Sequence, residues 1–222
     1  MTMFVKRLYL FVVFSLLVVS GFAQEPPFFR DIQAFKRQDS IAPPPANQIL
    51  FIGSSSFTYW KDVQDYFPKH RIINRGFGGS SLPDLIRYAN EIIFPYSPRQ
   101  IVIYCGENDL AASDTVSAAT VIERFQTLYS IIRSRLPLAE VTFVSLKPSP
   151  SRQHLFPKMM EVNAGVKAFL KKKKWTSFVD VFSKMLNADG APMEDLFVND
   201  RLHMNPKGYA IWKREIEPKL IK

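Results

Sequence analysis

Short apolar runs alternate with amphipathic stretches along the chain from residue 49 onward. The apolar runs are rich in Val, Ile and Phe and almost continuous in hydrophobicity, which is typical of parallel strands buried on both faces of a sheet. We predict five such strands, at Ile49–Ile52, Arg71–Asn74, Ile101–Tyr104, Val141–Leu146 and Phe178–Val181.

The stretches between these strands carry helical periodicity. The clearest has apolar residues three or four positions apart, which form one face of a helix; they are Val121, Phe125, Leu128, Ile132 and Leu136. A later stretch repeats the pattern with Met159, Val162, Val166 and Phe169. Strands with intervening helices predict a three-layer α/β domain, in which sites form outside the carboxyl ends of the strands.

Two helix starts are marked by their sequence. Ser81 is followed three residues later by Asp84, with Pro83 between them, which resembles a capping box. Asn205 stands directly before Pro206, so a side-chain cap precedes a proline at the first helical position. We therefore predict that helices begin just after Ser81 and just after Asn205.

Residues 1–23 have the three parts of a secretory signal peptide. A short basic stretch precedes the apolar run Leu8–Val19, and the small residues Gly21 and Ala23 precede a cleavage site before Gln24. A retained transmembrane anchor is the alternative, but a spanning helix needs about 20 apolar residues and this run is shorter. We expect cleavage, export to the periplasm or the extracellular space, and no stable membrane anchor afterwards.

The remaining chain divides into a lead-in, residues 24–48, and one domain, residues 49–222. In the lead-in, Phe29, Ile32 and Phe35 fall at helical spacing, so we expect a short helix that packs on the domain. Pro43–Pro45 follow as a stiff, extended spacer. The domain is long enough to bury a sizeable hydrophobic core.

The charge balance is basic. The formal net charge is +9, and loss of Lys6 and Arg7 with the signal peptide leaves +7. Much of this charge lies in Lys171–Lys174 at the end of a predicted helix, where cations complement the helix dipole, so we expect a solvated face and no nucleic-acid partner. Cys105 is the only cysteine and ends an apolar run, which predicts a buried, inert thiol and no internal disulfide.

Small or polar residues follow the first three predicted strands. Gly53–Ser56 can expose a hydroxyl at a turn that leads from the strand into a helix, which we predict around Tyr59–Phe67. Gly76–Ser81 can bring backbone N–H groups close to a ligand. Asn108 would add a side-chain amide at the same edge. Taken singly, a plain loop, a phosphate-binding turn or a turn-forming Asn explains each equally well. The glycine spacing is a poor fit to a dinucleotide-binding fingerprint.

A carboxylate and an imidazole follow the fifth predicted strand. Asp200 precedes His203 by three residues, just ahead of the predicted helix start at Asn205. This spacing lets the carboxylate turn onto imidazole Nδ1, which leaves Nε2 as an acceptor toward a nucleophile. A loop histidine with only a structural hydrogen bond is the alternative for His203 taken alone.

Together, the serine turn, the glycine-rich turn, Asn108 and the Asp200–Tyr209 block resemble the SGNH hydrolase superfamily, also described as GDSL-like lipases and acylhydrolases. The four blocks occur in the family order over Ile49–Trp212, and the last block, Asp-x-x-His-x-Asn-x-x-Gly-Tyr, is the most specific. The resemblance implies a flavodoxin-like, three-layer α/β/α sandwich. Its five-stranded parallel sheet would have the order 2-1-3-4-5.

The resemblance also implies site residues. Ser55 would be the nucleophile, His203 the general base and acid, and Asp200 the residue that orients it. The oxyanion hole would comprise the backbone N–H groups of Ser55 and Gly79 and the side chain of Asn108. The family usually has Asp where this chain has Ser54, which leaves Ser54 and Ser56 as alternative nucleophiles.

The function implied is that of a secreted serine esterase acting on O-acyl esters, which we expect to be short, such as acetyl groups on a small molecule or a glycan. A lipid esterase similar to lysophospholipases or platelet-activating-factor acetylhydrolase, an acyltransferase, and a non-catalytic glycan-binding module are the alternatives. We expect no cofactor, and no metal, because the three histidines do not have zinc-ligand spacing.

Two neighbouring features are expected to be structural. The loop Lys147–Arg152 follows the fourth strand and should overhang the cleft. We expect it to be solvated and stiffened by its prolines, although Lys147 and Arg152 are also candidates for contacting an anionic or sugar group. Trp60, just past the serine turn, is expected to lie in the core.

Overall fold

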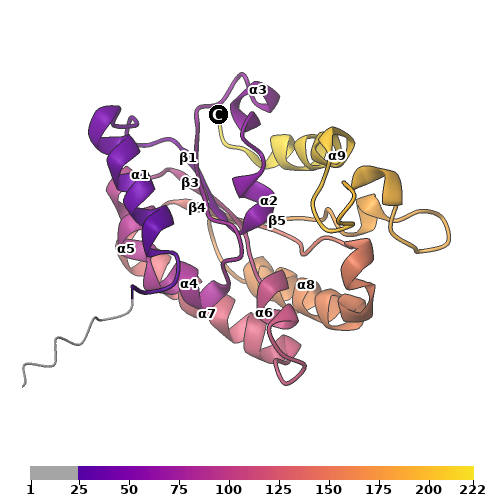
Figure 1. Cartoon of the computed structure of the whole chain (residues 1–222). Coiled ribbons are helices and arrows are strands. Elements are labelled where there is room, and N and C mark those ends of the chain that lie inside the picture. The colour runs from indigo at the N-terminus through magenta and orange to yellow at the C-terminus, as the bar shows by residue number, and fades with distance from the viewer. Residues whose placement is uncertain (1–24) are drawn as a thin grey trace, which may run out of the picture.

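The computed structural model describes residues 25–222, so the predicted signal peptide, residues 1–23, lies outside the described residues. The chain forms one parallel sheet with helices on both faces (Figure 1). The strands are β1 (Ile49–Gly53), β2 (Ile72–Gly76), β3 (Gln100–Tyr104), β4 (Glu140–Val144) and β5 (Thr176–Val179). Their order is β2-β1-β3-β4-β5, which confirms the predicted fold class and sheet order.

The register of the sheet aligns the carboxyl ends of its first three strands. Gly53 at the end of β1 is paired with Gly76 at the end of β2 and with Tyr104 at the end of β3. The loops that follow these strands therefore leave the sheet at one level. This alignment places the serine turn, the glycine-rich turn and the Asn108 loop at one edge.

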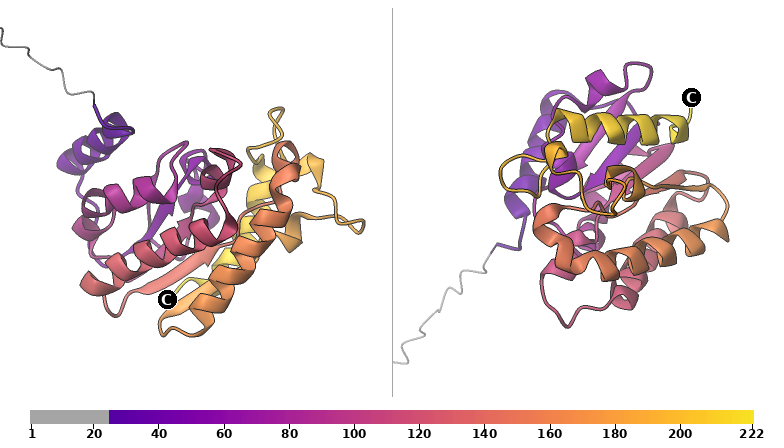
Figure 2. Two further views of the ribbon diagram at one scale, coloured as in Figure 1. Left: turned by 90° about the horizontal axis from the view of Figure 1, so that it is seen from below. Right: turned by 90° about the vertical axis from the view of Figure 1, so that its right-hand side faces the viewer.

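Nine α-helices in the described part of the chain cover the sheet. They are α1 (Phe29–Ile41), α2 (Ser55–Thr58), α3 (Val63–Tyr66), α4 (Leu82–Arg87), α5 (Ala89–Ile92), α6 (Glu107–Ala111), α7 (Ala118–Arg135), α8 (Phe156–Lys171) and α9 (Pro206–Ile216). The apolar residues of α1, α4, α5, α7 and α8 pack in one core cluster, and those of α2, α3 and α9 pack in a second. In the right-hand view of Figure 2, α9 (yellow) lies on one side of the sheet, and α7 and α8 (pink to orange) lie on the other.

The strand residues divide between these two clusters in alternation. In β1, Leu50 and Ile52 belong to the first cluster, whereas Ile49 and Phe51 belong to the second. Successive side chains of a strand point to opposite faces, so a strand covered on both faces must be apolar throughout. Every residue of β1 is buried, which explains its continuous hydrophobicity.

The lead-in helix α1 packs on the first core cluster, as predicted. Ile32 is buried in that cluster, and Phe28 lies edge-on to Phe77 with ring centroids 5.2 Å apart. A polar contact fixes the other end of the helix, where Asp39 pairs with the largely buried Arg75 of β2. The lead-in is therefore attached to the domain by both apolar and ionic contacts.

Both predicted helix starts are confirmed. The Ser81 backbone N–H donates to Asp84 Oδ2 at 2.9 Å, as a capping box requires. Asn205 Oδ1 accepts a hydrogen bond from the Lys207 N–H at 2.9 Å. Each cap satisfies backbone N–H groups that have no partner within the helix.

The segment after β1 differs from the single helix expected around residues 59–67, because it forms two short helices, α2 and α3. The Asn74 side chain donates to the carbonyl oxygens of Phe57 at 2.7 Å and of Trp60 at 3.4 Å. These bonds satisfy carbonyl groups at the end of α2, so the helix stops after one turn. Trp60 is fully buried, as predicted, and stacks on Tyr209.

The remaining structural expectations concern exposure. Cys105 is buried, and its burial, together with the nearby Asp109 carboxylate, raises the pKa of the thiol well above its usual value. Lys171–Lys174 are all exposed, as expected for a solvated face. Among residues 25–222, no helix is long and apolar enough to cross a membrane.

Gly53 is the more sterically constrained of the two glycines in the sheet. Its φ is +145°, and a Cβ atom there would lie 1.9 Å from the carbonyl oxygen of Tyr104. We expect Gly53→Ala to lower the free energy of unfolding by about 3 kcal/mol or more, measured by urea denaturation, because the neighbouring backbone must move. Gly190→Ala is the matched control: its φ is also positive, but nothing lies within 4 Å. A cost for Gly53→Ala no larger than that for Gly190→Ala would contradict this account.

Candidate active site

The residues predicted for the site meet at the carboxyl edge of the sheet. Ser55 is the first residue of α2, two residues after the end of β1, and Asn108 is the second residue of α6, after β3. Gly79 lies in the turn after β2, and the loop before α9 carries Asp200 and His203. Segments separated by up to about 150 residues thus converge where the register brings the strand ends together.

Three of these side chains form a hydrogen-bonded chain. His203 Nε2 lies 2.9 Å from Ser55 Oγ, and His203 Nδ1 lies 2.6 Å from Asp200 Oδ2. With the proton on Nδ1, the ring donates to the carboxylate and accepts from the serine hydroxyl. This is the arrangement that a hydroxyl nucleophile, a general base and an orienting carboxylate require.

The Asp200 carboxylate is held by its own loop. Its Oδ1 accepts the N–H groups of Leu202 and His203, both at 2.9 Å. Partial burial alone would raise the pKa of Asp200, but these N–H groups and the His203 ring outweigh it and lower the pKa to about 2. The carboxylate therefore keeps its negative charge at neutral pH and well into the acidic range.

The loop that carries Asp200 and His203 is stabilised along its length. The Val198 N–H donates to the His203 carbonyl oxygen at 2.9 Å, which closes the turn between them. The Asn205 side chain donates to the carbonyl oxygens of Asp195 at 2.8 Å and Phe197 at 3.1 Å. Asn205 therefore caps α9 and also fixes the loop that presents the imidazole.

Two backbone N–H groups next to the site residues have no hydrogen-bond acceptor within the described residues. Within residues 25–222, neither the Ser55 N–H nor the Gly79 N–H donates a hydrogen bond. The Gly79 φ of +84° lies in the left-handed region, which favours glycine. Both groups are thus available to a ligand oxygen.

The Asn108 amide already has partners at both ends. Its Nδ2 donates to Ser54 Oγ at 2.7 Å and to the Ser80 carbonyl oxygen at 3.0 Å. Its Oδ1 accepts from Arg152 Nη2 at 2.9 Å. A ligand oxygen that took a hydrogen bond from this amide would share or replace one of the two acceptors of Nδ2.

The three adjacent serines have different surroundings. Ser55 Oγ contacts His203, whereas Ser54 Oγ accepts from Asn108. Ser56 Oγ is buried and has no hydrogen-bond partner within the described residues. Of the three hydroxyls, Ser55 alone has a base beside it in this part of the chain.

The expectation of a solvated loop at Lys147–Arg152 is wrong. The Lys147 side chain is 2% exposed, and its Nζ lies 2.8 Å from Glu107 Oε2. Arg152 Nη1 lies 3.2 Å from Glu107 Oε1, and Ser149 Oγ donates to the same oxygen at 3.2 Å. A buried carboxylate thus draws both cations inward, because it would otherwise be left without a compensating charge.

This cluster of Glu107, Lys147 and Arg152 shifts the ionisation of its members. Burial alone would raise the pKa of Glu107, but the two cations outweigh it and lower that pKa. Burial lowers the pKa of Lys147, and Glu107 opposes this shift. Burial and the neighbouring Glu107 raise the pKa of Tyr104, whose hydroxyl donates to the same carboxylate. Sequence reasoning singled out Lys147 and Arg152 but missed Glu107, although it directly precedes Asn108.

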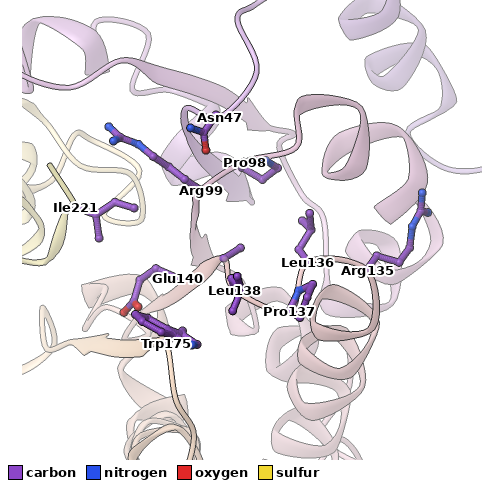
Figure 3. Close-up of a pocket in the computed structure, with 11 residues that line it drawn as sticks. Asn47, Pro98, Arg99, Arg135, Leu136, Pro137, Leu138, Glu140, Trp175 and Ile221 are labelled. Carbon is purple, nitrogen blue, oxygen red and sulfur yellow. The ribbon is translucent and has the colours of Figure 1, made fainter.

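The hollows around and away from the site differ in size. The cavity bordered by Ser54, Ser55 and Asn108 has a volume of about 10 Å³, close to the space of one water molecule. An open, mainly apolar pocket of about 480 Å³ lies at the opposite edge of the sheet, where β4 begins at Glu140, and Trp175 and Leu138 line it (Figure 3). Within residues 25–222, no group of three or more His, Cys, Asp or Glu side chains is placed to hold a metal ion.

Comparisons with known proteins give one family match and several solved structures of similar fold. The model of the GDSL-like lipase/acylhydrolase family matches residues 52–211, and a search of curated proteins finds no match. A Streptococcus pneumonia structure described as a candidate platelet activating factor has a TM-score of 0.76 and 21% identity, over 86% of this chain and 92% of that one. A GDSL-like lipase from Bacteroides thetaiotaomicron has a TM-score of 0.73 and 20% identity, over 85% and 96%.

A catalytic mutant of an acetylxylan esterase from Geobacillus stearothermophilus has a TM-score of 0.63 and 15% identity, over 79% of this chain and 95% of that one. At these identities the three structures support the fold alone. The family model is the finding that extends over the residues of the site, because it runs from the end of β1 into α9.

The low pKa of Asp200 predicts how stability changes in acid. A carboxylate whose pKa is lowered to about 2 in the folded protein contributes stability above its ordinary pKa of 3.8 and loses it as the pH falls toward 2. The stabilisation that the wild type has over Asp200→Asn, measured as a difference in Tm, should therefore shrink as the pH falls from about 4 to about 2. It should be only a few degrees, because the Asp200 side chain is 47% exposed.

Thermal unfolding followed by circular dichroism over this pH range measures that difference. Asp189→Asn is the control, because it removes an exposed carboxylate that forms no ion pair within the described residues. A difference for Asp200→Asn that did not vary with pH would mean that the carboxylate is not held as described.

Proposed function

The chain belongs to the GDSL-like lipase/acylhydrolase family, and from this premise we propose that it is a serine esterase that hydrolyses short O-acyl esters, with Ser55 as the nucleophile. Membership of the family makes it a hydrolase of ester bonds. The observation that carries the finer proposal is the hydrogen-bonded chain from Ser55 through His203 to Asp200. The proposal further includes export after removal of residues 1–23.

The reaction proceeds in two steps. Ser55 Oγ attacks the ester carbonyl carbon while His203 Nε2 takes the hydroxyl proton, and the same nitrogen returns that proton to the departing alcohol. Water then attacks the acyl-enzyme, with His203 again accepting the proton and passing it to Ser55 Oγ as the carboxylic acid leaves. Asp200 stabilises the imidazolium in both steps through its bond to Nδ1.

The tetrahedral intermediates carry negative charge on the former carbonyl oxygen. The N–H groups of Ser55 and Gly79 support a role as oxyanion donors, because neither has another acceptor within the described residues. Asn108 is the third donor, and it redirects one amide hydrogen from Ser54 Oγ or the Ser80 carbonyl toward the oxyanion. A preorganised donor of this kind typically changes kcat by about 10²–10³-fold.

The hollow beside Ser55 gives no enclosed space for a long acyl chain. The cavity next to Ser55 has a volume of about 10 Å³, so a long acyl chain would have to lie on the surface. The ring of Tyr59, which is 56% exposed, lies edge-on to His203 with ring centroids 4.6 Å apart. An exposed aromatic ring beside the base offers a packing surface to a sugar. An acetylated carbohydrate is therefore the substrate class that we favour, in line with the acetylxylan esterase of similar fold.

Replacement of the nucleophile distinguishes catalysis from binding alone. Ser55→Ala should abolish turnover of p-nitrophenyl acetate, because it removes the nucleophile. It should leave Tm within a few degrees of the wild type, because Ser55 is a half-buried residue at the start of a short helix. Ser56→Ala is the matched control: its hydroxyl is buried without a partner in the described chain, so its loss should leave kcat within about twofold. Wild-type rates in Ser55→Ala, or a larger loss in Ser56→Ala, would remove Ser55 from the mechanism.

A series of p-nitrophenyl esters from acetate to decanoate tests the acyl preference. We expect kcat/KM to be highest for the shortest esters and to fall about tenfold or more by octanoate, because the cavity has no room for the additional methylene groups. The same series run with an added sugar acceptor separates hydrolysis from acyl transfer by its products. A maximum at octanoate or decanoate would reject the short-chain proposal and favour a lipid esterase.

A further inference from the structure

We propose that Arg152 is a positioning residue for the reaction: anchored by the buried Glu107 carboxylate, it holds the Asn108 amide so that the NH₂ group faces the oxyanion. This inference rests on the proposed function. It concerns a residue outside the four family blocks, on the loop after β4 that the sequence led us to expect in solvent.

The orientation of an asparagine amide decides whether it helps or harms an oxyanion. Its oxygen and nitrogen ends are nearly equal in size, so a rotated amide would present a repelling oxygen in place of a donor. Arg152 Nη2 lies 2.9 Å from Asn108 Oδ1, and a guanidinium group can only donate. The atom that faces Arg152 must therefore be the oxygen, and the NH₂ group must face the other way.

This constraint persists during the reaction. In the resting site Nδ2 also donates to Ser54 Oγ and the Ser80 carbonyl oxygen, but one of those bonds weakens when the amide turns a hydrogen to the oxyanion. The bond from Arg152 to Oδ1 is unaffected by that exchange. A cation at Oδ1 also polarises the amide and strengthens its N–H groups as donors.

Glu107 fixes Arg152 in place. Its Oε1 lies 3.2 Å from Arg152 Nη1, and its Oε2 lies 2.8 Å from Lys147 Nζ. One carboxylate between two cations leaves a net positive charge beside Asn108, which favours the negative charge that develops in the transition state. Lys147 pairs with Oε2 of Glu107, and Arg152 uses Nη1 for Oε1. Arg152 Nη2 is therefore left to donate to the Asn108 amide.

The same loop is also bonded to the segment that carries the base. The Ser151 N–H donates to the Arg201 carbonyl oxygen at 3.0 Å, between Asp200 and His203 in sequence. The Arg152 N–H turns back to the Ser149 carbonyl oxygen at 2.9 Å. The loop therefore joins the oxyanion side of the site to the imidazole side, and this explains why it is drawn inward rather than left in solvent.

A double-mutant cycle with Asn108 tests the proposal. We expect Arg152→Met to lower kcat for p-nitrophenyl acetate by about 10- to 10²-fold and to leave KM within about twofold. Without the hydrogen bond from Arg152, the Asn108 amide is no longer held in one orientation and loses part of its interaction with the oxyanion. In the Asn108→Ala background, Arg152→Met should lower kcat by no more than about twofold further, since the group that it positions is already absent. As a single variant, Arg152→Lys should retain more activity than Arg152→Met, because lysine keeps a charged donor.

Arg124→Met is the matched control. Arg124 of α7 lies with its Nη1 2.8 Å from the buried Asp109 of α6, the residue after Asn108. This variant therefore breaks a comparable ion pair to the helix that carries Asn108, without removing a contact of the amide. It should lower Tm while leaving kcat within about twofold. If Arg152→Met did not fold, Arg152→Lys would be judged by the same criterion: a loss in kcat of about 3- to 10-fold that disappears in the Asn108→Ala background.

The proposal would be overturned if Arg152→Met lowered kcat equally with and without Asn108, or if it left kcat unchanged. An effect confined to KM would also overturn it, because Arg152 would then contact the substrate. These outcomes are read against a wild type whose Ser55-dependent activity is measured in parallel. A wild type without that activity would reject the proposed function. An active wild type with an equally active Arg152→Met variant would reject this inference alone.

Discussion

The site depends on three parallel strands ending at one level. Gly53, Gly76 and Tyr104 are paired across β2, β1 and β3, and at Gly53 the backbone approaches Tyr104 so closely that no Cβ atom fits. Because the strands stop together, the turns that follow them begin within reach of one another. This backbone alignment, rather than contacts between side chains, brings together the Ser55 hydroxyl, the free N–H groups and the Asn108 amide.

Much of this could be predicted from the sequence, because the relevant signals are local. Continuous apolar runs predicted all five strands, and caps at Ser81 and Asn205 predicted two helix starts. The short spacing between Asp200 and His203 predicted that one would bond to the other. The sheet order and the meeting with Ser55 came from a family resemblance, since no local pattern specifies how segments about 150 residues apart are placed.

The failures have a common physical cause. Lys147 and Arg152 were expected in solvent, because long charged side chains beside prolines usually lie there. Their burial is decided by Glu107, about 40 residues earlier, which requires compensating charge once the fold covers it. Likewise α2 stops early because the Asn74 side chain on another strand bonds to its carbonyl groups. In both cases a distant partner overrides the local preference.

The central claim is that one hydroxyl of three adjacent serines is activated by the His203–Asp200 pair. Mass spectrometry of the intact, folded protein after reaction with a fluorophosphonate measures this directly, because the reagent attaches to an activated serine oxygen with loss of fluoride. The account predicts one adduct per chain, located at Ser55 after peptide mapping and absent when His203 is replaced by Ala. An adduct at Ser54 or Ser56, or no adduct in protein shown to be folded, would contradict it.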